Sequence, residues 1–137
     1  MVPAPRRPGF TLLEVVVVLA ILGMVLGLLG SQRPARSARL ELEGAARSLA
    51  GELQLARSRA IAENRITTIA IAQTAYVRDG APPQLLPPRI TATPPGTIRF
   101  APDGSASGGS ITLQGEGRAI RVSIAWLTGQ VATTVLR

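Results

Sequence analysis

The chain of 137 residues contains no cysteine, no histidine and no lysine, and only 3% of its residues are aromatic. Without cysteine there is no disulfide, thiol nucleophile or thiolate metal site, and without histidine the commonest general base and transition-metal ligand is missing. Asp79-Gly80 and Asp103-Gly104 are typical of turns rather than of calcium loops. The other acidic residues show no paired spacing, so we expect no catalytic centre, no metal and no cofactor, and therefore no enzyme.

The basic residues are all arginines, and their positions indicate a membrane rather than a nucleic acid as their partner. The formal net charge is +7. Arg6 and Arg7 precede a long apolar run, and Arg33, Arg36 and Arg39 follow it. A basic cluster beside a membrane segment is typical of contact with lipid headgroups. The remaining arginines are scattered, which argues against nucleic acid as a partner.

The apolar run from Phe10 to Gly30 has the length of a membrane-spanning helix. As a helix it would extend about 31 Å, close to the hydrocarbon core of about 30 Å. It is longer than the apolar region of a secretory signal peptide, which has about 7–15 residues. The basic residues before the run favour a cytoplasmic N-terminus. The arginines after it oppose that orientation, but this rule weakens when a long domain is translocated.

Three residues inside this run call for an explanation. Glu14 places a carboxylate where membrane insertion is costly, so we expect it to be used. Gly23 and Gly27 form a small-xxx-small pair that lets a second helix approach closely, although glycine is also common in membrane helices.

Pro34 follows the run and interrupts helical hydrogen bonding, so we predict a kink or linker over residues 31–36.

Residues 37–64 are predicted to form an amphipathic helix. Apolar residues recur every three or four positions and form one narrow face. This face contains Leu42, Ala46, Leu49, Leu53, Ala56 and Ala60. Glu43 and Arg47 lie outside it, in the order and at the spacing that favour an ion pair. The chain thus begins with a long helix whose first half lies in a membrane and whose second half packs on a folded head.

Residues 65–137 are predicted to be rich in β-strands. Strands are expected at 66–71, 97–101, 110–114, 119–126 and 130–136, with turns at 102–104, 115–117 and 128–129. In the strand 119–126, the apolar residues that alternate inward are Ile120, Val122, Ile124 and Trp126. Residues 79–96 contain six prolines and are expected to form a loop with a short edge strand near 89–91. These patterns predict an α+β fold in which an antiparallel meander packs one apolar face against the helix.

The segment Arg7-Pro8-Gly9-Phe10-Thr11-Leu12-Leu13-Glu14-Val15 resembles the processing site of type IV prepilins and type II secretion pseudopilins. It combines a small residue, a phenylalanine, and a glutamate four positions later with the apolar run. Further segments are similar to the H-type minor pseudopilin family (general secretion pathway protein H), which also includes FimT-like minor pilins. They are Leu53 to Ile61, Phe100 to Gly104, Gly108-Gly109 with Ile111 to Leu113, and Thr128 to Val131.

This resemblance implies a pilin-like fold and a subunit that is processed before it assembles. Residues 1–9 would be a leader, which prepilin peptidase removes by cleavage between Gly9 and Phe10 before it N-methylates Phe10. Residues 10–30 would be a transmembrane helix in the bacterial inner membrane. Residues 37–137 would form a periplasmic head.

The resemblance also implies a role for Glu14 in assembly. Its carboxylate would face the N-terminal amine of a neighbouring subunit when the helices bundle into a fibre. On the residues alone an alternative stays open, in which Glu14 caps the start of its own helix, where the helix dipole favours an anion.

Two functions are consistent with these features. In the first, the chain is a minor pseudopilin of the type II secretion pseudopilus and helps to export folded proteins across the outer membrane. Its partners would then be other pseudopilins, prepilin peptidase, the inner-membrane secretion platform and membrane lipid. In the second, it is a FimT-like minor type IV pilin that binds DNA during uptake through Arg118, Arg121 and Arg137. The scattered arginines favour the first.

Overall fold

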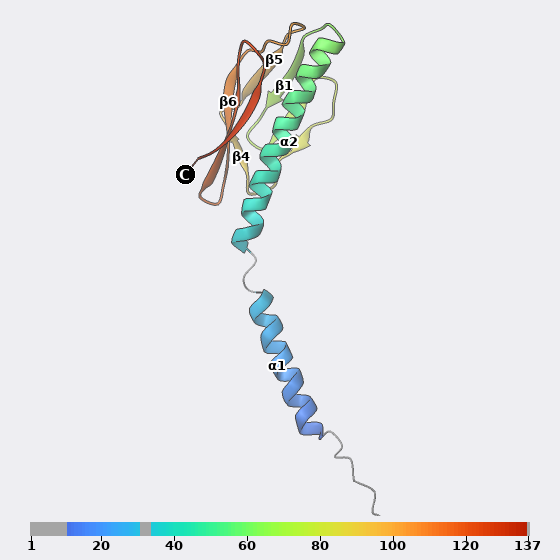
Figure 1. Cartoon of the computed structure of the whole chain (residues 1–137), viewed down its shortest axis with the longest axis vertical. Coiled ribbons are helices and arrows are strands. Elements are labelled where there is room, and N and C mark those ends of the chain that lie inside the picture. The colour runs from blue at the N-terminus through green and yellow to red at the C-terminus, as the bar shows by residue number, and fades with distance from the viewer. Residues whose placement is uncertain (1–10, 31–33, 137) are drawn as a thin grey trace, which may run out of the picture. The chain divides into compact units, whose positions relative to one another are not determined.

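The computed structural model describes residues 11–30 and 34–136, apart from the side chains of residues 28–30 and 34–37. The chain divides into two compact units, Met1–Ala35 and Arg36–Arg137. The first contains α1 (Leu12–Gly30). The second, which we call the head, contains almost all of α2 (Pro34–Ala62) and the strands β1 to β8 (Figure 1).

The helix α1 lies within the predicted segment 10–30, and its own described side chains are apolar except for Glu14. Large apolar side chains are exposed from Leu12 to Leu26, and none of the described side chains of α1 belongs to the apolar core. Glu14, in the first turn, is the only charged residue of this helix. Among the residues that the structure describes, no helix combines the length and the apolar character needed to cross a membrane.

The helix α2 is amphipathic and buries one face. It begins at Pro34, and proline suits the first helical position because the N–H there has no partner within the helix. The linker predicted over 31–36 therefore ends too late, because residues 34–36 already belong to α2. α2 ends at Ala62, two residues before Asn64, whose φ of 48° is typical of the residue that terminates a helix. The six apolar residues of the predicted face are all buried, which confirms that face.

The strands form two antiparallel sheets, and the expectation of a single meander is wrong. Sheet A has the order β3-β2-β1-β5, and sheet B has the order β4-β6-β7-β8. Sheet A consists of β1 (Thr67–Ile71), β2 (Ala75–Arg78), β3 (Gln84–Leu85) and β5 (Gly96–Phe100). Sheet B consists of β4 (Thr91–Thr93), β6 (Gly109–Gly115), β7 (Arg118–Ile124) and β8 (Val131–Leu136). The predicted meander is present as β6-β7-β8, but β5 pairs with β1 and places Ile98 opposite Ile69.

The proline-rich segment 79–96 contains two short strands as well as loop. β3 pairs with β2, and β4 pairs with β6. Both strands are at sheet edges, where the missing N–H of proline disrupts no ladder. The edge strand predicted near 89–91 lies two residues further on, and its Ala92 is fully buried. The sequence pattern does not predict β2, because Tyr76 is its only buried residue.

Trp126 is exposed, and the prediction that it points into the core is wrong. β7 ends at Ile124, so the inward alternation of the strand stops two residues before the tryptophan. The carbonyl of Trp126 accepts a hydrogen bond of 2.8 Å from the N–H of Ala106. Its side chain is 68% exposed, and the neighbouring Leu127 is exposed as well.

A single apolar core joins α2 to both sheets. Its largest fully buried side chains are Leu49 and Leu53 of α2, Ile69 and Phe100 of sheet A, and Leu113 and Val122 of sheet B. Each such apolar side chain contributes about 1.5–3 kcal/mol when it leaves water. Among the described residues, the core lies between residues 42 and 124. The head therefore contains a complete core and can fold without α1.

Candidate functional site

The first turn of α1 contains Glu14, the predicted assembly residue. The N–H of Glu14 donates to the hydroxyl of Thr11 at 3.3 Å and to its carbonyl at 3.1 Å. Threonine at the N-cap with glutamate three residues later is the pattern of a capping box. Within residues 11–30 and 34–136, the Glu14 carboxylate has no hydrogen-bond or ion-pair partner. Thr11 thus caps α1, and Glu14 lies in the first turn, where the helix dipole favours an anion.

The two glycines predicted to support helix packing lie one turn apart on α1. A Cβ added at Gly23 or Gly27 would meet no heavy atom within 4 Å. The backbone is therefore accessible at both positions, as close approach of a second helix requires. Gly9 and Phe10, the predicted cleavage site, lie outside the described residues, and their roles stay predictions.

The arginines expected to contact DNA in the second function do not form one surface. Arg118 and Arg121 lie three residues apart in β7, so their side chains are on opposite faces of sheet B. Arg118 shares its face with the buried Ile120 and lines a cavity there. Arg121 lies opposite Thr134 of β8 and is exposed on the other face. Arg137 lies outside the described residues.

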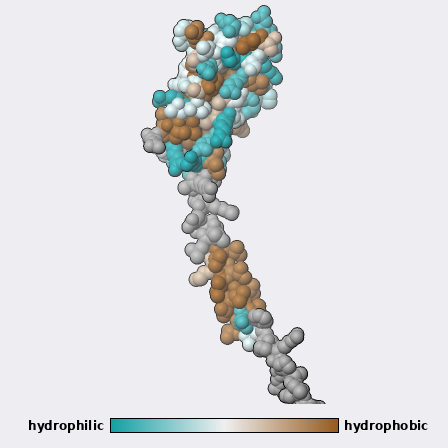
Figure 2. All heavy atoms as spheres, viewed as in Figure 1, coloured by the Kyte–Doolittle hydropathy of each residue, from teal (hydrophilic) through white to brown (hydrophobic). Residues whose placement is uncertain are grey.

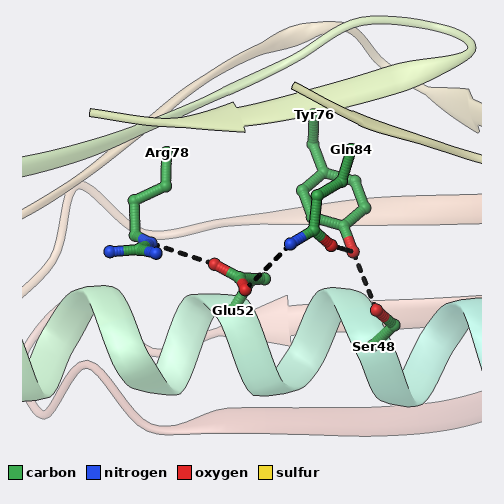
Figure 3. Close-up of polar contacts among 5 residues, drawn as sticks. All are labelled: Ser48, Glu52, Tyr76, Arg78 and Gln84. Carbon is green, nitrogen blue, oxygen red and sulfur yellow. Dashed lines mark hydrogen bonds and ion pairs between the residues drawn. The ribbon is translucent and has the colours of Figure 1, made fainter. Parts of the chain in front are cut away.

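A polar network links α2 to the hairpin formed by β2 and β3 (Figure 3). Glu52 accepts hydrogen bonds from Arg78 at 3.0 Å and from Gln84 at 3.2 Å. The hydroxyl of Tyr76 donates to Gln84 at 2.8 Å and lies 2.9 Å from the hydroxyl of Ser48. Ser48 and Glu52 are one turn apart on α2 and face the strands, so one helix face binds both strands of the hairpin.

Tyr76, Arg78 and Glu52 are largely shielded from solvent, whereas Ser48 and Gln84 are exposed at the edge of the network. The side chains of Arg78 and Glu52 are only 10% and 17% exposed. Removal of either partner would leave an uncompensated charge at a partly buried position. The sequence does not predict this network because its members come from three elements, and the spacing of Ser48 and Glu52 is the only local signal.

Three of the segments that carry the family resemblance meet at Arg57 of α2. The Nε of Arg57 donates to the carbonyl of Gly104 at 3.1 Å. Gly129, with φ of 62°, packs so closely that a Cβ would collide with the Gly104 carbonyl and the Arg57 side chain. Glycine is required there for both its backbone conformation and its small size. Arg57 thus joins the turn at 102–104 and the turn at 128–129 to α2.

Two ion pairs lie on the surface of the first half of α2. Arg39 donates to Glu43 at 2.7 Å, and Arg47 lies 3.8 Å from the other carboxylate oxygen of Glu43. The predicted pair of Glu43 with Arg47 is therefore present, but Arg39 makes the shorter contact. The hydrogen bond from Arg39 lowers the pKa of Glu43 and raises the pKa of the guanidinium.

The turn that contains Asp103 is held by its own side chain. The carboxylate of Asp103 accepts hydrogen bonds from the hydroxyl of Ser105 at 2.6 Å and from its N–H at 2.9 Å. The bond from the hydroxyl is the main reason why the pKa of Asp103 lies below its ordinary value. Across the described residues, no three side chains of the types His, Cys, Asp and Glu come together as metal ligands.

Two family models match the sequence. The model of the type II transport protein GspH matches residues 45–128, and that of the prokaryotic N-terminal methylation motif matches residues 5–30. No curated protein matches the chain.

Two solved structures are similar to the chain. The minor pseudopilin EpsH from the Type 2 Secretion System of Vibrio cholerae has a TM-score of 0.58 and 14% identity, over 69% of this chain and 97% of that one. The type IV minor pilin FimU of Pseudomonas aeruginosa has a TM-score of 0.56 and 18% identity, over 68% of this chain and 92% of that one. These matches confirm the predicted pilin-like α+β fold.

Proposed function

The chain belongs to the type II transport protein GspH family, and on this basis we propose that it is a minor subunit of a type II secretion pseudopilus. The proteins that share its fold are pilin and pseudopilin subunits, so it is a structural subunit and not an enzyme. On this proposal it helps to export folded proteins across the outer membrane by assembling with other pseudopilins on the inner-membrane secretion platform.

The observation that supports this proposal most strongly is the surface of α1. Its apolar side chains are exposed and its one charged residue, Glu14, has no partner within the described part of the chain. A helix of this kind is incomplete as an isolated element. Neighbouring helices and lipid would cover the apolar surface, and an amine would pair with the carboxylate.

The amine that fits Glu14 is the N-terminus of a neighbouring processed subunit. A carboxylate and an ammonium in a medium of low dielectric each cost several kcal/mol alone, and their pairing offsets much of that cost. A neighbour in the wrong register would leave Glu14 unpaired. The pair would therefore favour one register of the helix bundle.

The same proposal includes processing and membrane anchoring. The match to the methylation motif covers residues 5–30 and so includes Gly9, Phe10 and all of α1. Prepilin peptidase would cleave between Gly9 and Phe10 and methylate Phe10. α1 would then anchor the subunit in the inner membrane, with the N-terminus cytoplasmic and the head periplasmic.

To test processing, the full chain is co-expressed with a prepilin peptidase. The intact mass of the protein is then measured by mass spectrometry of the membrane extract. The expected product lacks residues 1–9 and carries one methyl group on Phe10. The variant Gly9→Arg should keep the full mass, because the bulky side chain blocks the cleavage site, whereas the control Gly23→Ala should be cleaved normally. An uncleaved wild-type chain, or a cleaved Gly9→Arg variant, would contradict the proposal.

A type IV minor pilin is the second candidate, because FimU matches the fold about as well as EpsH does. DNA uptake would require the head to bind DNA, and such binding weakens steeply with salt. A gel shift with residues 34–137 over a range of salt concentrations separates the two functions. The placement of Arg118 and Arg121 on opposite faces predicts no tight binding. DNA binding that is lost in the Arg118→Gln variant and also in the Arg121→Gln variant would favour the minor pilin.

A further inference from the structure

The inner face of β8 is left largely uncovered by α2. In β7, the inward residues Ile120 and Val122 are buried. Their partners across the ladder in β8, Val135 and Thr133, share this face of sheet B because paired residues point the same way. Yet Val135 is 66% exposed and Thr133 is exposed too. The beginning of β8 still packs on the core through Val131, but its inner face from Thr133 to Val135 is uncovered.

The uncovered face forms one wall of a groove beside the beginning of α2. The groove encloses about 480 Å³. Its apolar floor is formed by Leu42 of α2, Ile120 of β7 and Val135 of β8, and Leu136 lies at its end. We call it the α2–β8 groove. Figure 2 shows apolar and hydrophilic side chains next to one another at the end of the head where α2 begins.

The rim of the groove is basic. Arg39, Glu43 and Arg118 line it, and Arg47 lies next to Glu43. Arg39 and Arg47 share the one carboxylate, while Arg118 has no ion-pair partner within the described residues. Two guanidinium groups and one carboxylate thus line the groove, so its rim carries a net charge of about +1, and the guanidinium of Arg47 lies next to it. An occupant that fits must combine an anionic group with an apolar part.

We propose that the α2–β8 groove docks the head on an anionic phospholipid surface, with Arg118 against a phosphate and the apolar floor against the acyl chain. Phospholipid is the occupant with both required parts. Arg39 also follows Gly30, the last residue of α1, by only nine positions, which favours lipid over an acidic peptide. This inference rests on the proposed membrane anchoring, because α1 would hold the head near the bilayer before assembly.

The test uses the isolated head, residues 34–137, which contains its own core, and vesicles of phosphatidylcholine with or without phosphatidylglycerol. Co-sedimentation should detect binding only to the vesicles that contain phosphatidylglycerol. Arg118→Gln should weaken this binding about five-fold, the factor expected for one basic side chain near an anionic surface. The matched control Arg121→Gln removes the same charge from the opposite face of β7 and should weaken binding by less than about two-fold.

Three further variants distinguish binding in the groove from binding to a generally basic surface. Val135→Asn should weaken binding about three-fold because it removes apolar contact, whereas Val77→Asn, at a partly exposed valine of β2 in sheet A, should leave it unchanged. Glu43→Gln should strengthen binding because it removes the one carboxylate of the rim. Circular dichroism of each variant verifies that the head remains folded.

Three results would overturn the proposal. The first is equal binding by the Arg118→Gln and Arg121→Gln variants. The second is a vesicle affinity of the Val135→Asn variant equal to that of the wild type. The third is no binding to either vesicle, which would leave an acidic polypeptide as the occupant. None of these results bears on the proposed assembly, because residues 34–137 lack both α1 and Glu14.

Discussion

The two units of the chain use apolar residues in opposite ways. In the head, one face of α2 is apolar and is buried against both sheets. In α1, the described apolar side chains from Leu12 to Leu26 are exposed. The head thus buries the apolar face of α2 in its own core, whereas the described apolar side chains of α1 stay exposed.

The placement of charge differs in the same way. Glu52 in the head is partly buried and has its partner, Arg78, in the same chain. Glu14 in α1 has no partner within the residues that the structure describes. Folding therefore completes the head, and we infer that α1 is completed only by assembly.

The largest expected effect tests the claim that the head is held together by the buried face of α2. Leu49→Ala removes a fully buried side chain and should lower the free energy of unfolding of the head by about 2–5 kcal/mol. The control Leu40→Ala changes an exposed leucine of the same helix and should change it by less than about 0.5 kcal/mol. Urea unfolding of residues 34–137 measures both. Equal effects would mean that the burial described for α2 is wrong.

A smaller effect tests the junction at Arg57. Gly129→Ala places a methyl group against the Gly104 carbonyl at a positive φ, so the free energy of unfolding should fall by about 1–3 kcal/mol. Gly51→Ala is the control, because its site in α2 is open and alanine favours a helix by about 0.5–1 kcal/mol. In urea unfolding, Gly129→Ala should therefore lower the free energy of unfolding of the head, and Gly51→Ala should raise it. A stabilising Gly129→Ala would contradict the packing of the two turns.

The smallest effect concerns the exposed carboxylate of Asp103. Its pKa is lowered in the folded head by the hydroxyl of Ser105. The hydrogen bond therefore adds stability above the unfolded pKa, and that stability is lost as the pH falls through the folded pKa. Ser105→Ala should raise the pKa of Asp103 in a carbon-detected NMR titration, whereas Ser110→Ala should not. An unchanged pKa in the Ser105 variant would show that the hydroxyl is not its cause.

The sequence predicts those parts of the fold that depend on local periodicity. The apolar face of α2, the strands β6 and β7 and the turn at 115–117 follow from residues that are close in the chain. The position of Glu14 at the start of α1 follows from the motif around it. These elements are correct because helix and strand periods leave a direct pattern in the sequence.

The parts that the sequence does not predict depend on partners far apart in the chain. The division into two sheets depends on the pairing of β1 with β5, and β2 has only one buried residue to indicate a strand. Trp126 continues the alternation of β7 in sequence but lies beyond the end of that strand. The network around Glu52 requires side chains from α2, β2 and β3 to meet. The local pattern is absent from the pairing of β1 with β5, from β2 and from the network, and at Trp126 it is misleading.

The most direct test of the central claim is the incorporation of Glu14 variants into an assembled fibre. The full chain is produced together with prepilin peptidase and the other pseudopilins of its gene cluster, and co-purification with them is quantified. Glu14→Ala should be processed and inserted normally but co-purify at least about ten-fold less, because the partner amine is left unpaired. The control Glu41→Ala, at an exposed acid of α2, should co-purify like the wild type. Equal co-purification of the Glu14→Ala variant and the wild type would contradict the claim that assembly completes α1.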